Sequence, residues 1–332
     1  MANHDWTEVE WGMLDARVRS DALKGRQDHS ARQAIVRHGR SVLKKYSTSF
    51  FIVTRFLPPL KRAQVDMLYA GVRYPDEIVD TFEISPSRKD QKLALWREQF
   101  GRAMQCSMNQ SLLDGVPVIV AGLADVMRAN QIPASYYHHF LDAMSADVHP
   151  RRYATLDDLV ENYIYGSAIV VGYFLAYIYG ASNPAEFDRA LNASRHLGIA
   201  LQLTNFVRDV AEDKGRGRLY LPLNMLRSKG IQEDALNSPA TQHALAEVVR
   251  EVAVTAQEHY AAAGADLDAF APDCRLAIDA CIRVYGELND RVATSQAPLA
   301  KRESVSLSRK FSVLPPSKYW RLPLAYMGLE PA

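Results

Sequence analysis

The sequence predicts an all-α protein, and three observations support this prediction. Apolar residues recur with helical periodicity along most of the chain, and runs of alternating β-branched residues are scarce. Glycines and prolines cluster between the periodic segments. Because no repeat, low-complexity tract or long linker divides the 332 residues, we expect a single domain over 1–332, with an N-terminal extension (1–29) and a C-terminal tail (315–332).

The expected helices follow one another between these breaks. Their ranges are 30–46, 61–82, 88–109, 117–129, 134–145, 156–179, 187–213, 241–264 and 272–297. The breaks lie at Pro58-Pro59, Ser85-Pro86, Pro133, Pro150, Gly180 to Pro184, Gly215 to Pro222 and Asn237 to Pro239. Pro75 lies inside an expected helix. Because proline lacks a backbone donor and clashes with the carbonyl four residues earlier, we expect the helix to kink or restart there.

The segment from Tyr163 to Ala181 contains no charged residue and is almost long enough to span a bilayer. Its tyrosines and glycines, and the acidic residues just before it, favour instead a helix that is buried all round in a helical bundle. The glycines indicate close approach of another helix or of a ligand.

The overall composition is that of an ordinary globular protein, with 48% hydrophobic and 23% charged residues. A formal net charge of +1 gives no field for nucleic acid, so we expect no nucleic-acid partner. The three cysteines show no CxxC spacing, which favours reduced thiols. The first ten residues are acidic where a signal peptide needs a basic region, so we expect a cytoplasmic location.

Two aspartate pairs share one spacing, Asp76 with Asp80 and Asp209 with Asp213, and they are the only Asp-x-x-x-Asp pairs in the chain. Residues four apart lie one above the other on a helix, so each pair stacks two like charges. A hard cation such as magnesium removes that repulsion and binds substrate phosphate as well. One pair alone would be read as a solvated surface, whereas two pairs predict a clamp for a diphosphate.

Other polar residues share a helical face with each pair. On a period of about 100° per residue, Tyr69, Arg73, Asp76 and Asp80 fall at roughly 0°, 40°, 340° and 20°. Gln202, Asn205, Asp209 and Asp213 fall at roughly 0°, 300°, 340° and 20°. An ordinary amphipathic helix also carries a polar stripe, but amide side chains in an apolar context favour a binding site.

These motifs resemble the squalene/phytoene synthase family of head-to-head prenyl transferases, from about Ser47 to Arg302. The matching elements are Ser47, Ser49 and Phe50 in YSTSFF; YAGVRYPDEIVD from Tyr69 to Asp80; Tyr163, Tyr165, Gly166 and Gly172 in the central helix; QLTNFVRDVAEDKGRGRLYLP from Gln202 to Pro222; and, more weakly, Tyr285 and Arg302.

The resemblance implies an isoprenoid-synthase helical bundle around a central apolar cavity, with the acidic helices at its mouth. It also implies that two prenyl diphosphates condense through a cyclopropyl diphosphate to a symmetric hydrocarbon, with NADPH needed only if the product is squalene. Thr54 and Asp66 stand where enzymes for fifteen-carbon substrates tend to carry bulky aromatics. We therefore expect geranylgeranyl diphosphate as substrate and phytoene as product, although Ile169 replaces a glycine and narrows the space beside it.

The resemblance and the residue chemistry together assign roles. Metal ligands, for Mg²⁺ or alternatively Mn²⁺, are Asp76, Asp80, Asp209 and Asp213. Substrate-binding residues are Ser47, Ser49, Phe50, Thr54, Arg73, Gln202, Asn205, Arg208, Arg218 and Arg302. Catalytic residues are Tyr69, Arg73, Tyr163 and Tyr285. Ordinary salt bridges for the arginines and ordinary packing for the tyrosines are the alternatives.

Other functions stay open at this point. Farnesyl diphosphate as substrate would make the protein a squalene or dehydrosqualene synthase. A terpene cyclase or chain elongase is disfavoured because the Asp-Asp-x-x-Asp motif of elongases is absent, and a non-catalytic prenyl-diphosphate binder because both acidic pairs are intact. The tail KYWRLPLAYMGL mixes aromatic and basic residues, so it can lie in a membrane interface or dock on its own domain. The oligomeric state is undetermined.

Overall fold

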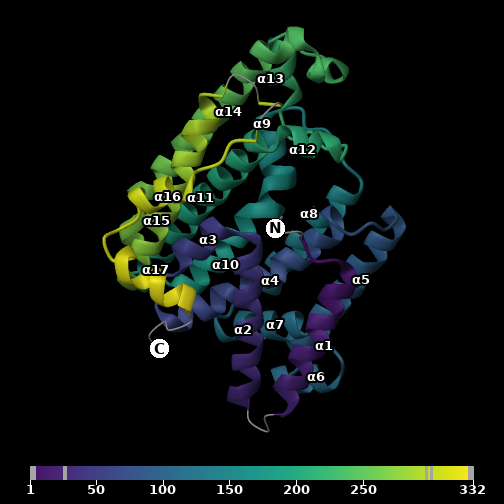
Figure 1. Cartoon of the computed structure of the whole chain (residues 1–332), viewed down its shortest axis with the longest axis vertical. Coiled ribbons are helices and arrows are strands. Elements are labelled where there is room, and N and C mark those ends of the chain that lie inside the picture. Colours follow the sequence, from purple (N-terminus) through teal and green to yellow (C-terminus); the bar gives the residue numbers. More distant parts are fainter. Residues whose placement is uncertain (1–4, 25–27, 296–297, 300–301, 328–332) are drawn as a thin grey trace. The chain divides into compact units, whose positions relative to one another are not determined.

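The computed structural model describes residues 5–24, 28–295, 298–299 and 302–327 (Figure 1). Throughout this part of the chain the regular structure is helical, and the β-structure amounts to an isolated bridge between Ala181 and Phe270. The prediction of an all-α protein is therefore confirmed. Cys106, Cys274 and Cys281 are free thiols, as expected.

The chain divides into two compact units, with the boundary between His149 and Pro150. Unit 1 holds the first acidic motif, and unit 2 holds the second acidic motif and the C-terminal tail. The single domain expected over 1–332 stays a prediction, and each unit is described by itself.

Unit 1 consists of eight helices within its described residues. They are α1 (Glu8–Lys24), α2 (Asp28–Tyr46), α3 (Thr48–Thr54), α4 (Pro59–Asp80), α5 (Pro86–Gln105), α6 (Met108–Leu113), α7 (Val118–Ala129) and α8 (Ala134–Val148). Helix α4 packs against α2, α7 and α8, and its central residues are buried (Figure 1). The expected helix 88–109 is two helices instead, because Ser107 accepts a hydrogen bond from the Gln110 backbone and starts α6.

Helix α4 runs without interruption through Pro75, so the expected restart at that residue is wrong. The reason lies in the acceptor that Pro75 leaves free, the Gly71 carbonyl. The Tyr137 hydroxyl of α8 donates to this oxygen at 2.6 Å and takes the place of the missing backbone bond. A buried carbonyl is thus satisfied from a neighbouring helix.

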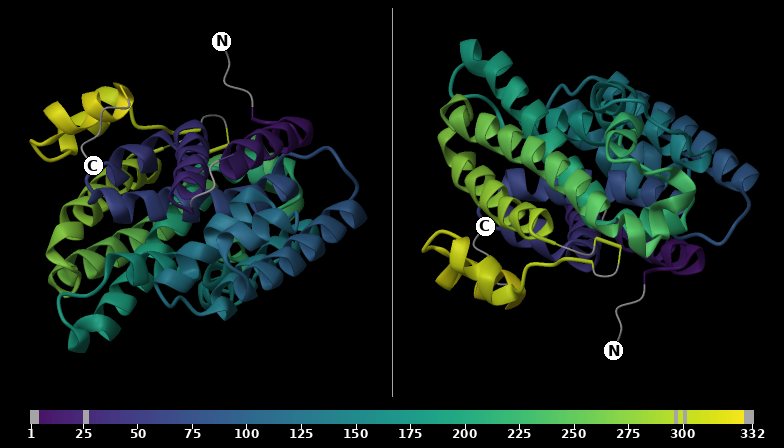
Figure 2. Two further views of the ribbon diagram at one scale, coloured as in Figure 1. Left: turned by 90° about the horizontal axis from the view of Figure 1, so that it is seen from below. Right: turned by 90° about the horizontal axis from the view of Figure 1, so that it is seen from above.

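Unit 2 is built around three long helices that run side by side, α11, α14 and α15 (Figure 2). Its elements are α9 (Leu156–Leu159), η1 (Val160–Ile169), α10 (Val170–Tyr179), η2 (Pro184–Glu186), α11 (Phe187–Arg208), α12 (Val210–Gly215), α13 (Leu223–Ser228), η3 (Glu233–Asn237), η4 (Pro239–Thr241), α14 (Gln242–Ala265), η5 (Leu267–Ala269), α15 (Pro272–Ala293), α16 (Leu307–Val313) and α17 (Lys318–Met327).

Residues 156–179 form one continuous helical stretch whose middle part, η1, is π-helical. A Cβ atom on Gly172 would lie 2.6 Å from the Ser194 carbonyl oxygen, and one on Gly198 would lie 3.0 Å from that of Ala168. The glycines therefore serve close packing against α11, one of the two roles expected for them.

By length and composition alone this stretch could cross a membrane, and half of its apolar window is buried. The expectation that it is buried all round is wrong, because Tyr173 and Tyr177 are half-exposed. Within its unit the stretch packs chiefly on α11, which covers one side of it. Partial burial of an apolar helix is common in helical bundles and is weak support for a span.

The expected helix 187–213 is also two helices, and the break falls on a candidate site residue. Helix α11 ends at Arg208, and Asp209 has φ −105° and ψ 15°, outside the helical range, before α12 begins at Val210. Helix-type hydrogen bonds continue across the break, from Asp209 N to Asn205 O and from Asp213 N to Asp209 O, both 2.9 Å. The calculated position of Asp213 on the stripe is therefore only approximate, because the helix bends at Asp209.

Candidate functional site

In unit 1, Arg73 of α4 holds the carboxylates of the first acidic motif together. Its guanidinium donates to Asp76 Oδ2 at 2.5 Å and forms an ion pair with Glu77. The same group lies 4.5 Å from the centre of the Tyr46 ring, a cation–π contact. Arg73 and Asp76 are thus brought together as expected, and Asp80, one turn further along α4, is half-buried.

The sequence did not predict the burial of Glu77 or the rise in its pKa. Its side chain is fully buried. Burial raises the pKa of Glu77 to about 7, against the opposing effect of Arg73. Glu77 lies about 100° around the helix from Asp76. The sequence therefore places it off the face that carries Asp76 but does not show how deeply it is buried.

The expected substrate-binding residues of α3 are placed by a helix cap. Ser47 accepts a hydrogen bond from Phe50 N at 3.3 Å and so begins the helix. The Phe50 ring lies 5.9 Å from that of Tyr69, which brings two candidate residues together. Ser49 is half-buried on the same helix.

Thr54 does not border open space, contrary to the expectation from the sequence. Its side chain is 1% exposed, and its hydroxyl donates to Phe51 O at 2.9 Å and accepts from Arg55 Nη2 at 3.0 Å. Arg55 in turn forms a buried ion pair with Asp66, the second residue expected to leave room. Neither position carries an aromatic ring, and we therefore expected open space there. The Arg55 guanidinium lies between these two side chains instead.

In unit 2, two arginines converge on Asp209. Arg208 Nε donates to Asp209 Oδ1 at 2.8 Å, and Arg302 Nε donates to the same oxygen at 2.7 Å. Although burial alone would raise the pKa of Asp209, these guanidinium groups hold it below its usual value. Arg302, 93 residues further along the chain, therefore meets the adjacent candidates Arg208 and Asp209, and the carboxylate is ionised at neutral pH.

The loop after α12 folds back on Asp213. The backbone N–H groups of Arg216 and Arg218 donate to the Asp213 carbonyl at 3.0 and 2.8 Å. Gly217 makes this turn possible with φ +77°, a left-handed conformation that favours glycine. The turn carries Arg218 into the interior, where its side chain is 7% exposed. A glycine helix stop and a buried cationic side chain are both present in this loop.

An aromatic cluster lies beside this loop. The Tyr163 ring is stacked 4.8 Å from that of Tyr220, which in turn is stacked 4.2 Å from Phe206. The Tyr220 hydroxyl donates to the Tyr163 hydroxyl at 3.1 Å. Tyr163 was a candidate from the sequence, whereas Tyr220 and Phe206 were not, although both lie within the second motif.

The remaining candidates of unit 2 are half-buried. Gln202 Nε2 donates to Ser167 Oγ at 3.4 Å and links α11 to η1. Asn205 lies one turn before Asp209 on α11, and Tyr285 lies on α15.

The four aspartates fit magnesium by their chemistry. Among the residues that the structure describes, no three His, Cys, Asp or Glu side chains form a cluster that could hold a metal. Magnesium usually takes only one or two protein carboxylates and completes its shell with water and phosphate. Hard oxygen donors, one of them the ionised Asp209, meet that requirement.

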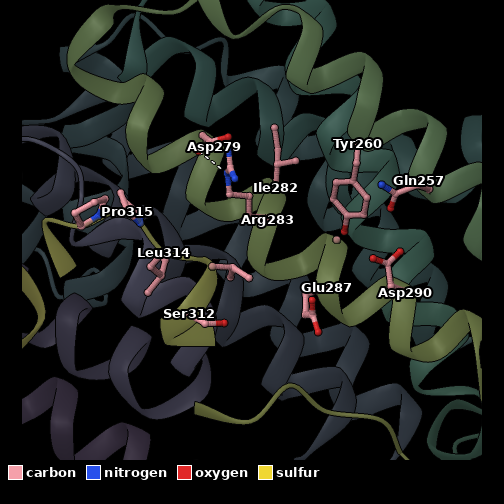
Figure 3. A pocket seen from close by; sticks show the side chains of 13 residues that line it. Gln257, Tyr260, Asp279, Ile282, Arg283, Glu287, Asp290, Ser312, Leu314 and Pro315 are labelled. Atoms are coloured by element: carbon pink, nitrogen blue, oxygen red, sulfur yellow. Dashed lines mark hydrogen bonds and ion pairs between the residues drawn. The ribbon is translucent and has the colours of Figure 1, made fainter. Parts of the chain in front are cut away.

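A hollow of about 640 Å³ lies elsewhere in unit 2, between α14, α15 and residues 312–316 (Figure 3). Two of its three carboxylates are paired: Arg283 donates to Asp279 at 2.8 Å, and Arg309 donates to Glu287 at 2.8 Å (Figure 3 shows the first pair). None of the candidate site residues lines it, so we assign it no part in the site.

Comparison with known proteins places these features in context. The family model described as squalene/phytoene synthase matches residues 43–310. The 15-cis-phytoene synthase of Enterobacter agglomerans is 33% identical over 277 residues, which cover 81% of this chain and 90% of that protein. The 15-cis-phytoene synthase of a Paracoccus strain is 31% identical over 264 residues, covering 79% and 83%.

Solved structures share the fold. A dehydrosqualene synthase determined with a ligand superposes with a TM-score of 0.72 at 22% identity, covering 89% of this chain and 98% of that chain. A squalene synthase from Alicyclobacillus acidocaldarius gives a TM-score of 0.66 at 19% identity, covering 79% and 94%.

Proposed function

Because the chain belongs to the squalene/phytoene synthase family, we propose that it is a prenyltransferase that condenses two geranylgeranyl diphosphates to phytoene. The observation that carries the choice of substrate is the similarity to bacterial 15-cis-phytoene synthases over most of both chains. In the first half-reaction a C–O bond of one substrate breaks, diphosphate leaves, and the double bond of the other substrate attacks the cation. Loss of one proton gives the cyclopropyl diphosphate.

In the second half-reaction the remaining diphosphate leaves, the carbon skeleton rearranges, and loss of a second proton ends the reaction. Both departures need positive charge near the leaving oxygens in a site shielded from water. Magnesium, or manganese in its place, would supply such charge when held by Asp76, Asp80, Asp209 and Asp213. The arginines that already lie against these carboxylates, Arg73, Arg208 and Arg302, are suited to bind diphosphate oxygens bidentately.

The candidate arginines differ in how easily their side chains can move to bind a diphosphate. The Arg302 side chain is 60% exposed while paired with Asp209, so it can exchange the carboxylate for a phosphate at small cost. Arg218 is buried and is therefore held in place. We propose that Arg218 forms a fixed part of the diphosphate site and that Arg302 closes on it.

The candidate tyrosines would act on the cationic intermediates. The ring faces in the cluster of Tyr163, Phe206 and Tyr220 present negative potential, which favours a carbocation. Tyr69 lies against Phe50 and shares α4 with Asp76, so its hydroxyl is suited to orient the diphosphate or a proton-accepting water. Tyr285 of α15 is proposed as a further catalytic residue, as expected from the sequence.

A second candidate is condensation of farnesyl diphosphate, because solved squalene and dehydrosqualene synthases share the fold. The burial of Thr54 weakens the argument for a long cavity at that point, so the preference for the longer chain rests on the relatives. NADPH would be required only for squalene. A non-catalytic binder is disfavoured because both acidic pairs are present.

The test is incubation of purified protein with MgCl₂ and either diphosphate, with and without NADPH, followed by mass analysis of the extracted hydrocarbons. We expect phytoene from geranylgeranyl diphosphate without NADPH, and none when the divalent cation is chelated. A thirty-carbon product formed exclusively from farnesyl diphosphate would replace the proposed substrate. Absence of hydrocarbon from either substrate would overturn the proposed activity.

We also propose that the protein works in the cytoplasm in peripheral contact with a membrane, because its substrates and product are oily. On α17, Leu322 and Ala325 are buried while Tyr319 and Trp320 are 67% and 58% exposed. The tail therefore docks by one face and presents aromatic side chains on another, as interfacial helices do. Lys318 does not contribute a free cation, since it donates to Phe311 O at 2.6 Å. Leu329 lies outside the described residues.

A further inference from the structure

Three aromatic side chains of unit 1, Trp6, Trp11 and Tyr46, form an N-terminal aromatic cluster. Trp6 lies just before α1, Trp11 lies on α1, and Tyr46 is the last residue of α2. The Trp11 and Tyr46 rings are stacked with their centroids 5.8 Å apart. Trp6 meets both rings edge-on, at 5.0 Å from Trp11 and 5.7 Å from Tyr46. Each ring therefore contacts the other two in a geometry that aromatic pairs favour.

A hydrogen bond and a further ring contact fix this cluster. The Tyr46 hydroxyl accepts from Trp6 N at 2.8 Å, so both ends of the tyrosine side chain have partners. Trp11 is 2% exposed and meets the ring of Tyr74, on α4, edge-on at 5.1 Å. The cluster thus reaches the helix that carries the first acidic motif, at the residue next to Arg73.

Helix α1 is itself fastened to the rest of unit 1. Arg19 donates to Leu112 O and to Val116 O, both at 2.7 Å. Near the other end of α1, Glu8 pairs with Lys92 of α5 at 2.5 Å. Both ends of the helix are therefore held, and the cluster that it carries is a fixed part of the unit.

Arg73 is the charged residue of the site that this cluster contacts. Its guanidinium lies 4.5 Å from the centre of the Tyr46 ring, inside the limit of about 6 Å for a cation–π contact. The same guanidinium pairs with Asp76 and with the buried Glu77. Its side chain is 25% exposed, and the attraction to an aromatic ring grows as the cation loses water.

The ring and the carboxylates differ in what they leave free for a substrate. Asp76 is a proposed metal ligand, so Arg73 must exchange this carboxylate for a phosphate oxygen when it binds diphosphate. The Tyr46 ring is neutral, and its attraction to the guanidinium does not depend on which anion Arg73 binds. A side chain that is held beforehand also loses less freedom on binding.

Family membership assigns no role to the two tryptophans, because the family model begins at residue 43. From the sequence, Trp6 and Trp11 belong only to the expected N-terminal extension, 1–29. Their contacts with Tyr46, which directly precedes the candidate residue Ser47, connect this extension to the site.

We propose that Tyr46 is a positioning residue that holds the Arg73 guanidinium ready for diphosphate, and that Trp6 and Trp11 keep the Tyr46 ring in place. This role rests on the proposed function, in which Arg73 binds diphosphate. The N-terminal extension then supports the first acidic motif through an aromatic contact, without touching the substrate.

Calorimetric titration of the full-length protein with inorganic pyrophosphate in MgCl₂ measures this role without turnover. Tyr46→Leu should weaken pyrophosphate binding about threefold to tenfold, the range of a partly desolvated cation–π contact. Tyr46→Phe keeps the ring and should recover most of the affinity. Trp6→Leu should weaken binding about twofold, through the loss of one edge-on contact. Tyr136→Leu, at a half-buried tyrosine of α8 outside the candidate site, should leave it unchanged.

A second background shows whether Tyr46 acts through Arg73. In Arg73→Met, the further change Tyr46→Leu should not alter the Kd, because the group that Tyr46 positions is absent. An equal loss in both backgrounds would show a packing role and overturn the proposal. So would pyrophosphate binding that Tyr46→Leu leaves unchanged. If denaturant unfolding shows that Tyr46→Leu does not fold, Trp6→Leu takes its place in the same cycle, with the same criterion.

The positioning role and the proposed function can fail separately. If the wild type forms hydrocarbon while the effects of Tyr46→Leu and Arg73→Met on the Kd are additive, the condensation stands and the positioning role is rejected. If the protein forms no hydrocarbon but the two substitutions are coupled in pyrophosphate binding, the positioning role stands and the condensation is rejected.

Discussion

Trp96 Nε1 donates at 2.8 Å to the hydroxyl of Tyr137, which donates in turn at 2.6 Å to the carbonyl oxygen of Gly71. In a regular helix the backbone N–H of residue 75 would bond to that oxygen, but Pro75 has none. Burial raises the pKa of Tyr137 well above its usual value, so its hydroxyl stays a donor. A side-chain relay thus completes the helix that carries the first acidic motif.

We predict that Tyr137→Phe lowers the free energy of unfolding by about 1–3 kcal/mol, because Gly71 O and Trp96 Nε1 both lose their partner inside the protein. Pro75→Ala in the Tyr137→Phe background should recover part of this loss, since Ala at position 75 supplies an N–H for Gly71 O. Denaturant unfolding of the wild type, both single variants and the double variant measures the coupling. Strictly additive effects would contradict the relay.

The ion pair between Arg55 and Asp66 gives a second prediction. Their side chains are 1% and 3% exposed. Asp66→Leu should cost about 3–5 kcal/mol because it leaves a buried guanidinium uncompensated, whereas Arg55→Met together with Asp66→Leu should cost much less. Urea unfolding distinguishes the two variants, and a double variant as unstable as Asp66→Leu alone would count against the explanation.

This pair also changes what a substitution at Thr54 can report. By the sequence argument that Thr54 leaves room for a longer chain, Thr54→Phe would narrow the cavity and favour the shorter substrate. Because the Thr54 hydroxyl accepts from Arg55 at 3.0 Å and the side chain is buried, an aromatic ring there must displace the ion pair. The free energy of unfolding of this variant must therefore be measured together with its chain-length preference, because loss of the ion pair alone can change both.

His38 makes the stability of unit 1 depend on pH. Burial lowers the pKa of His38 to about 4, although Asp15 acts in the opposite direction. Lys92 and Tyr74 line one hollow of unit 1 together with His38. The unfolded chain, with a histidine pKa of about 6.5, binds more protons than the folded chain between these values. The contribution of His38 is therefore fully present above about pH 6.5 and is lost as the pH falls towards about 4, by up to about 3 kcal/mol.

The comparison with His38→Gln isolates this effect. The variant should lose less stability than the wild type between pH 7 and pH 5, measured as the shift of the guanidinium unfolding midpoint. His243→Gln, at a side chain that is 81% exposed, is the matched control and should follow the wild type. Parallel curves for His38→Gln and the wild type would show that His38 does not titrate in this window.

The features that follow from local spacing could be predicted from the sequence. Apolar periodicity gave the helices, and the four-residue spacing of the aspartates, with the arginine three residues before Asp76, brought Arg73 and Asp76 together. Arg302 became a candidate only through the family resemblance, and its pairing with Asp209 was not predicted, because nothing in local spacing relates residues so far apart.

Features that depend on tertiary partners could not be predicted in this way. Pro75 is tolerated because of Tyr137, far along the chain, and Thr54 is buried because Arg55 finds Asp66. The break at Asp209 leaves no mark in the periodicity of the segment, since helix-type hydrogen bonds continue across it. The hollow of unit 1 lined by Trp11, His38 and Tyr74, among others, has no sequence signature, because five helices contribute to it.

Activity should depend on both acidic pairs. Asp76→Asn and Asp209→Asn should each lower the turnover of prenyl diphosphate by at least about 100-fold, a loss typical of removing one element that stabilises a transition state. Asp21→Asn and Asp188→Asn, at exposed positions outside the motifs, serve as matched controls in units 1 and 2. Near-normal hydrocarbon yield from either motif variant would refute the metal assignment.

Membrane contact should depend on the exposed face of α17. Deleting the tail would uncover whatever Leu322 and Ala325 bury, so substitution of the exposed residues is the cleaner test. Tyr319→Ser combined with Trp320→Ser removes two aromatic side chains suited to a lipid interface, while the buried face stays intact. We expect flotation with liposomes that contain anionic lipid to fall severalfold for this variant and to stay unchanged for Val254→Ser, at a side chain on α14 that is 53% exposed.

Since the proposed site residues are untouched, turnover of a detergent-solubilised substrate should match the wild type in both variants. Equal flotation of all three proteins would exclude these aromatics from membrane contact and leave docking as the role of the tail.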